Sequence, residues 1–145
     1  MVDDLTIVSQ LEDLTRARAW VGDHARAAGM PEQTVNELRL AVSEAVANVI
    51  EHGYRGEPNH NIDLHLAVDG TQLVLTIHDD GDPFELQAYE PPDLDQPHEG
   101  GYGVFLIRNL MDEVRYESPP GGGTTLTLVK YYRKDKRTDG RPNGE

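Results

Sequence analysis

The stretch SEAVANVIEHGY, residues 43–54, lies inside a longer amphipathic pattern that runs from Pro31 to Gly53. Its apolar residues recur every three or four positions, which predicts one helix with an apolar face. Glu44 and Asn48 interrupt this run four residues apart, so both side chains project from the same side of the helix. A carboxylate and an amide in this arrangement can hold a metal ion and activate a hydroxyl group. They can equally form a solvated stripe.

The composition places limits on the class of protein. The chain has 145 residues and no cysteine, which excludes a disulfide framework and a thiolate metal site. We expect one domain over residues 1–132 and a polar, disordered tail over 133–145. The N-terminus is acidic and no apolar run approaches the roughly 20 residues needed to span a bilayer. A cytoplasmic protein without membrane association is therefore expected.

The charge is strongly acidic. Asp and Glu total 26 against 13 Lys and Arg, for a net charge of −13. Nucleic acid is excluded as a partner on this ground, because its phosphates would be repelled. The acidic body favours basic protein partners or serves solubility alone.

The hydrophobic pattern predicts an α+β domain in which helices cover one face of a sheet. Ser9 and Glu12 match a capping box at the start of the first helix. Asp69-Gly70 predicts a hairpin turn, and the Pro-rich, acidic residues 85–100 predict a long loop. We expect helices over 11–28, 31–53 and 104–111, and strands over 4–8, 62–68, 73–77, 114–117 and 124–132.

Two short motifs lie next to predicted strands. Asp79-x-Gly81 ends a buried strand, where the carboxylate can accept a hydrogen bond from an exocyclic amine and the glycine lets a flat ring approach. Residues 121–125 read GGGTT, so Thr124 and Thr125 can offer hydroxyls beside a close backbone approach. Taken singly, each motif is also explained as an ordinary turn.

A third motif precedes the last predicted helix. Gly101-Tyr102-Gly103 leads into that helix at Val104. Glycines at a helix N-terminus let phosphate groups reach free backbone N–H groups, although glycines also serve simple turns. No strand immediately precedes the motif and no Gly-Lys-Ser/Thr follows it, so it matches neither the dinucleotide fingerprint nor the Walker motif.

In their order and spacing, the four elements resemble the motif set of the GHKL ATPases. The first corresponds to that family's N box and the others to its glycine boxes. Residues 43–54 and the run from Gly103 to Met111-Asp-Glu-Val114 are similar to the bacterial anti-sigma serine kinases of the RsbW and SpoIIAB type. A sensor histidine kinase is disfavoured, because only one predicted helix precedes residue 31 and His24 has no phosphoacceptor signature.

The resemblance implies a two-layer α/β sandwich of the GHKL (Bergerat) type, with a mixed, mostly antiparallel sheet. It also implies that the protein binds ATP and Mg²⁺. Glu44 would be the general base, Asn48 the Mg²⁺ ligand, and residues 85–100 the ATP lid. The implied nucleotide-binding residues are Asn48, Asp79, Gly81, Gly101, Tyr102, Gly103, Val104, Thr124 and Thr125.

Three positions depart from the family pattern. Pro83 stands where many members have a glycine, and Ala47 stands where some relatives carry a hydroxyl. Gly100 follows Glu99 where these kinases commonly have a basic residue. Arg55, Arg108 or an arginine of a partner are candidates to replace that charge.

The implied function is a partner-switching serine kinase that phosphorylates a STAS-type anti-anti-sigma protein and holds a sigma factor or another output protein. By analogy with the family, a homodimer around the N-terminal strand is expected, with the first helix, including Arg16 and Arg18, as a partner surface. That helix face is equally explained as salt-bridged and solvated. Two alternatives stay open: an ATP-binding module with little or no kinase activity, and an activator of a phosphatase or cyclase.

Overall fold

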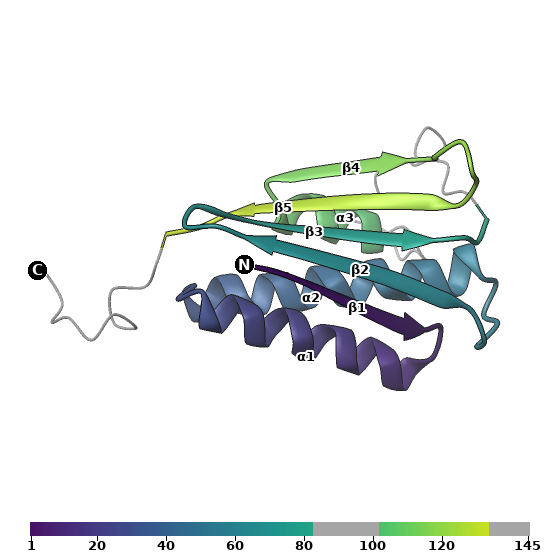
Figure 1. The fold of residues 1–145 in the computed structure, drawn as a ribbon, viewed down its shortest axis with the longest axis horizontal. Helices are drawn as coiled ribbons and strands as arrows, with labels where there is room; N and C mark the ends of the chain where they lie inside the picture. Colours follow the sequence, from purple (N-terminus) through teal and green to yellow (C-terminus); the bar gives the residue numbers. More distant parts are fainter. Residues whose placement is uncertain (83–101, 134–145) are drawn as a thin grey trace, which may run out of the picture.

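The computed structural model describes residues 1–82 and 102–133 (Figure 1). The predicted loop 85–100, Pro83, Gly100, Gly101 and the tail from residue 134 lie outside the described residues. In chain order the elements are β1 (Val2–Val8), α1 (Leu11–Ala27), α2 (Glu32–Asn48), the π-helical turn η1 (Val49–Gly53), β2 (Asn61–Val68), β3 (Gln72–Asp79), α3 (Tyr102–Leu110), β4 (Glu113–Glu117) and β5 (Thr124–Tyr131).

The five strands form one sheet in the order β1-β2-β3-β5-β4. Every pairing between the described strands is antiparallel, so the sheet is not mixed. Side chains alternate between the two faces of each strand, and the register places apolar residues in rows on one face. One such row runs across the sheet through Leu5, Leu64, Ile77 and Leu126.

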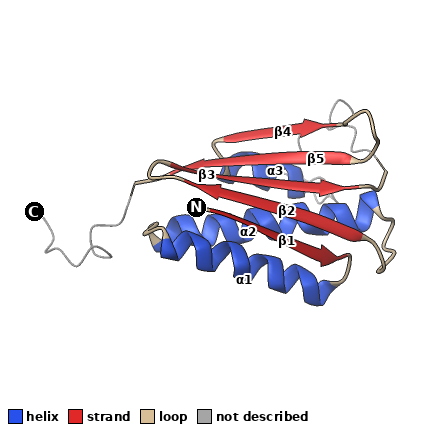
Figure 2. Ribbon diagram, viewed as in Figure 1, coloured by secondary structure: helices blue, strands red, loops and turns tan. Residues whose placement is uncertain are grey.

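The helices cover this apolar face, as Figure 2 shows. Helix α2 packs against both α1 and α3 and is therefore the central helix of the layer. Its buried positions, such as Leu38, Val42 and Val46, follow the predicted helical spacing. The α+β class and the arrangement of helices on one face are confirmed. No helix among the described residues has the length and apolar character needed to cross a bilayer.

The predicted helix over 31–53 is divided in the structure. Helix α2 ends at Asn48, and the next five residues form the π turn η1. The N–H of Tyr54 donates to the carbonyl of Val49, five residues earlier, at 2.9 Å. The π turn leads to Gly53, which packs against the end of the sheet. π turns of this kind often lie at functional sites.

The predicted cap of the first helix is wrong. Helix α1 starts after Gln10 without a side-chain cap. The hydroxyl of Ser9 donates instead to the carbonyl of Glu57, and its Oγ accepts the N–H of His60 at 3.2 Å. Ser9 is buried, and the backbone groups of the loop before β2 compete successfully for its side chain. The start of α1 is thereby attached to that loop.

Candidate functional site

Glu44 and Asn48 lie together against the start of α3. A Cβ atom added to Gly103 would be 3.2 Å from Glu44 Oε2, 3.2 Å from Asn48 Oδ1 and 3.1 Å from Asn48 Nδ2. Only a glycine at position 103 therefore lets the two side chains reach the backbone of this helix without displacement. The first N–H groups of a helix have no partner within it. A carboxylate and an amide therefore meet the first turn of α3.

The amide of Asn48 has an unused group. Within the described part of the chain, its Nδ2 atom is buried and has no hydrogen-bond partner. A buried polar atom without a partner costs stability, so such an atom calls for an explanation. A half-turn of the amide presents Oδ1 at the same point. The group therefore suits a ligand that approaches between α2 and α3.

Asp79 ends β3 on the side of the sheet that faces the helices. Its side chain is 3% exposed, and its Oδ1 accepts the N–H of Gly81 at 2.9 Å. Burial raises the pKa of the Asp79 carboxyl above its ordinary value, because a charged carboxylate loses solvation there. A buried carboxylate at the end of a strand is suited to accept a hydrogen bond from an amine of a bound ring.

Three glycines bring backbones into close contact around Asp79. A Cβ on Gly81 would be 2.3 Å from the carbonyl oxygen of Gly53, and one on Gly123 would be 2.0 Å from that of Asp79. Gly123 also has a φ of +79°, which other residues rarely adopt. The N–H of Asp82 donates to the Gly53 carbonyl at 2.7 Å. The end of β3 is thus held between η1 and the start of β5.

The structure brings Thr124 to this site and places Thr125 elsewhere. Thr124 is the cross-strand neighbour of Asp79 and is buried on the same face. Thr125 pairs with His78 on the opposite face, and its hydroxyl lies 2.9 Å from His78 Nδ1. Since neighbouring residues of a strand point to opposite faces, one strand cannot present both hydroxyls to one site. We retain Thr124 alone as a candidate.

The other predicted residues are less informative. Tyr102 is the first residue of α3, and Val104 is buried at 4% exposure. Of the cations considered as substitutes for a basic residue at position 100, Arg55 forms an ion pair with Asp82 at 2.6 Å. Arg108 lies in the last turn of α3, away from the end that faces Glu44. Neither arginine is placed at the start of α3.

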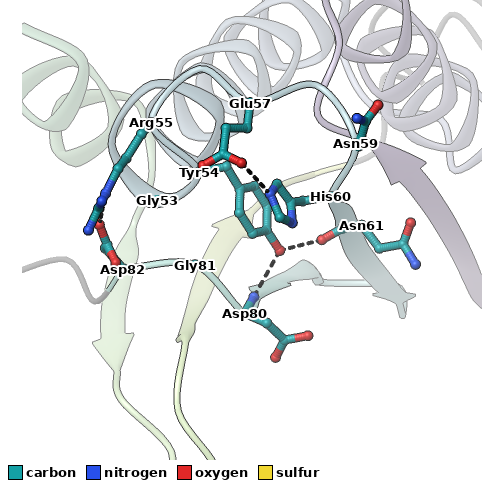
Figure 3. A pocket seen from close by; sticks show the side chains of 10 residues that line it. All are labelled: Gly53, Tyr54, Arg55, Glu57, Asn59, His60, Asn61, Asp80, Gly81 and Asp82. Atoms are coloured by element: carbon teal, nitrogen blue, oxygen red, sulfur yellow. Dashed lines mark hydrogen bonds and ion pairs between the residues drawn. The ribbon is translucent and has the colours of Figure 1, made fainter.

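Gly53 and Tyr54 lie next to the site, and the sequence analysis did not identify them. Both line a polar cavity of about 470 Å³ beside the turn that follows β3, together with Arg55, His60, Asp80 and other residues drawn in Figure 3. Their position directly after the Glu44–Asn48 motif was the available signal. It was read only as the end of a helix.

Comparison with known proteins defines the class. Residues 7–130 match the family model described as the histidine kinase-like ATPase domain. Because the match covers most of the chain, the protein belongs to this family of GHKL ATPases. An ATP-binding domain is consistent with the buried Asp79 and the glycine contacts around it.

Within the family, the chain is similar to proteins named as an anti-sigma factor and as serine-protein kinases. It is 33% identical over 140 residues to the anti-sigma F factor of Halalkalibacterium halodurans, covering 92% of this chain and 94% of that protein. It is 29% identical to the serine-protein kinase RsbW of Bacillus subtilis over 92% of this chain and 87% of the relative. The RsbW of Staphylococcus aureus is 34% identical over 81% of this chain and 77% of its own length.

Solved structures agree on the fold. The RsbU and RsbW domains of a Mycobacterium tuberculosis protein match 92% of this chain with a TM-score of 0.62 at 21% identity. The chain spans about a third of that solved chain, 34%. A blue-light activated histidine kinase of Erythrobacter litoralis matches 74% of this chain, and 33% of its own, with a TM-score of 0.56 at 24% identity.

The contact between Gly81 and Gly53 predicts a sharp steric limit. We expect Gly81→Ala to lower the free energy of unfolding by about 1–3 kcal/mol, because the new methyl group meets a backbone carbonyl that cannot move away cheaply. Gly70→Ala is the matched control, since a Cβ there meets nothing within 4 Å. Urea unfolding measures both variants. Equal stabilities would contradict the close contact.

The raised pKa of Asp79 predicts that replacing its carboxylate with a neutral amide stabilises the fold, by an amount that depends on pH. A group whose pKa is raised on folding favours the folded state below its unfolded value, 3.8, and loses this contribution as the pH rises through the folded value. Asp79→Asn keeps the Oδ1 acceptor but cannot ionise. We expect this variant to exceed the wild type in stability at pH 7, with the difference shrinking as the pH falls toward 4.

Thermal unfolding across this pH range tests the prediction. Asp23→Asn, at an exposed position on α1, is the control for the loss of one negative charge. A wild-type protein as stable as Asp79→Asn at every pH would show that burial of the carboxylate carries no cost.

ATP affinity is expected to fall at least tenfold in Asp79→Asn, since a carboxylate accepts more strongly than an amide.

Proposed function

We propose that the chain is an ATP- and Mg²⁺-dependent serine-protein kinase of a partner-switching system. Its substrate would be a serine on a STAS-type anti-anti-sigma protein, and it would also hold a sigma factor or another output protein. The observation that carries the proposal is the meeting of Glu44, Asn48 and Gly103 at the start of α3. The names of the relatives, anti-sigma F factor and serine-protein kinase RsbW, support it.

Asp79 and Thr124 would bind the adenine end of ATP. The Asp79 carboxylate is buried and aligned by the N–H of Gly81, so it can accept a hydrogen bond from the adenine amino group. The glycines at 81 and 123 let the backbones of η1 and β5 pack closely around this carboxylate. Backbone N–H groups of Gly103 and Val104, at the N-terminus of α3, would face the phosphates, where the helix dipole favours negative charge.

The residues present fit a magnesium ion. Mg²⁺ prefers oxygen ligands and usually takes several from water and phosphate rather than from a protein cage. No group of three or more His, Asp or Glu side chains suited to a metal is found among the described residues, whereas the Nδ2 atom of the Asn48 amide is buried without a partner among them. Asn48 would hold the ion, which would neutralise charge on the transferred phosphoryl group.

Glu44 would act as general base. Its carboxylate lies beside Asn48 against Gly103, so a serine hydroxyl reaching this point meets an acceptor for its proton. The serine oxygen forms a bond to the γ-phosphorus, the bond from that phosphorus to the bridging oxygen of ADP breaks, and the hydroxyl proton passes to Glu44. Most of the rate enhancement in such a transfer comes from positioning and charge neutralisation.

The partner assignments extend the proposal. A sigma factor is suggested by the anti-sigma F factor of Halalkalibacterium halodurans. The net charge of −13 suits a basic surface on a partner and disfavours nucleic acid. A homodimer in the cytoplasm, without membrane association, completes the proposed state of the protein.

A second candidate is an ATP-binding module that grips its partner without useful catalysis. It is favoured by Gly100, which stands where these kinases commonly carry a basic residue. Arg55 is occupied by Asp82, and Arg108 lies at the far end of α3, so neither supplies that charge to the phosphates. Steady transfer of phosphate to a STAS protein would exclude this candidate.

Glu44→Gln separates the two candidates within the same binding site. We expect phosphotransfer to a STAS protein to fall about 100-fold or more, because the variant cannot take the serine proton, while ATP affinity stays within about threefold of the wild type. Glu51→Gln, an exposed change seven residues further along, is the matched control. Labelling from radioactive ATP measures transfer, and calorimetry measures affinity. Retained labelling in Glu44→Gln would remove it as the base.

Partner identity is tested by capture on the immobilised protein with and without Mg-ATP. Mass spectrometry of the bound proteins is expected to find a STAS protein, with phosphoserine only when ATP is present. A sigma factor should be released when the unmodified STAS protein is added. Capture of a phosphatase or cyclase in place of a sigma factor would contradict the sigma-factor assignment and favour an activator of that enzyme.

A further inference from the structure

Tyr54, the first residue after the π turn, contacts the turn that follows β3 through its hydroxyl group. The hydroxyl donates to the carbonyl of Asn61 at 2.5 Å and accepts the N–H of Asp80 at 2.9 Å (Figure 3). The residue is 5% exposed. One hydroxyl therefore joins the loop after η1, the start of β2 and the end of β3.

A second contact joins the same two segments. The carbonyl of Gly53 accepts the N–H of Asp82, and the Cα of Gly81 packs directly against Gly53. Two successive residues at the end of the Glu44–Asn48 helix thus hold the backbone on both sides of Gly81. The conformation of this turn fixes the direction of the Asp79 carboxylate, because Gly81 donates its N–H to that group.

Tyr54 is itself held rigidly. Its ring stacks on His60 with centroids 4.5 Å apart and planes inclined by 11°. His60 exchanges backbone hydrogen bonds with Ser9, through its N–H to Ser9 Oγ and its carbonyl to the Ser9 N–H. Burial raises the pKa of the Tyr54 hydroxyl, so it stays protonated and able to donate to Asn61. The hydroxyl that accepts the N–H of Asp80 is therefore held in a fixed position.

We propose that Tyr54 is a positioning residue for nucleotide binding: its hydroxyl sets the conformation of the turn Asp79–Asp82, and through it the group that recognises the base. Tyr54 itself does not touch the nucleotide or the reacting atoms. The inference rests on the proposed function for its ligand, since ATP is the molecule that this turn would bind.

The proposal separates affinity from turnover. Removing the hydroxyl leaves the N–H of Asp80 and the carbonyl of Asn61 without their partner, so the turn can leave the binding conformation. Glu44, Asn48 and Gly103 lie on α2 and α3 and keep their arrangement. A change at Tyr54 should therefore raise KM for ATP while kcat at saturating ATP stays unchanged.

Tyr54→Phe tests this, with Tyr132→Phe as the matched control. The hydroxyl of Tyr132 also donates to a backbone carbonyl, that of Asp69, at the opposite end of β3. With the full chain and Mg-ATP, we expect Tyr54→Phe to raise Kd and KM for ATP about fivefold to tenfold, because the turn loses the hydrogen bond that holds the Asp80 N–H. Tyr132→Phe should stay within twofold of the wild type.

Calorimetry measures the binding stoichiometry and Kd separately. If part of the Tyr54→Phe protein is unfolded, the stoichiometry falls, but the Kd of the folded fraction can still be measured. Hydrogen exchange supplies a readout that needs no nucleotide. The amide hydrogen of Asp80 should exchange at least tenfold faster in Tyr54→Phe than in the wild type. In Tyr132→Phe its exchange rate should match that of the wild type.

The outcomes are distinct. A Kd for Tyr54→Phe within twofold of the wild type, or a fall in kcat at constant KM, overturns the positioning role. A wild-type protein that binds no ATP defeats the proposed function, and the exchange measurement then decides the role of Tyr54 in the turn. If hydrogen exchange at the Asp80 amide is the same in Tyr54→Phe as in the wild type, the positioning role of Tyr54 is wrong.

Discussion

The contact between Gly53 and Gly81 is the constraint on which the site depends. It joins η1, which follows the central helix α2, to the turn that follows the central strand β3. A side chain on Gly81 would force these two segments apart, because its Cβ would lie 2.3 Å from a backbone oxygen. Because neither position carries a side chain, the π turn after Glu44 and Asn48 lies directly against the turn after Asp79.

The site is built from groups that weaken the isolated protein. The Asp79 carboxylate is buried, and its raised pKa reflects the lost solvation of the charge. The Nδ2 of Asn48 is buried without a partner among the described residues. The apolar rows between sheet and helices offset such losses. Polar groups that are poorly satisfied in the free protein are typical of ligand-binding sites.

Much of the fold follows from periodicity. Alternation over residues 62–68, the nearly all-apolar run 73–77 and the Asp69-Gly70 turn predicted the hairpin, and three-to-four spacing predicted α2. The same spacing continues through residues 49–53, so nothing local announces a π turn. Ser9 matched a helix cap, but its hydroxyl binds the distant loop around Glu57. A local rule fails wherever a contact far along the chain is stronger.

The candidate site could be predicted only in part, because it also depends on contacts between residues far apart in the sequence. The order of the four motifs and the family resemblance predicted Glu44, Asn48, Asp79 and Gly103 as candidates, but the pairing register of β5 with β3 is a long-range property. Without that register the two threonines cannot be distinguished. Once Thr124 is opposite Asp79, the alternation of the strand assigns Thr125 to the other face with His78.

The two halves of the site rest on different supports. Asp79, Thr124 and Gly123 are fixed by the sheet, whereas Asn48 and Gly103 are fixed by the packing of α2 on α3. Lys130 of β5 secures the far end of α3, since its Nζ donates to the carbonyl of Leu110 and pairs with Glu37 of α2 at 3.7 Å. The two groups of residues therefore depend on different contacts, and a substitution that disturbs the packing of α2 on α3 leaves the pairing of Asp79 with Thr124 intact.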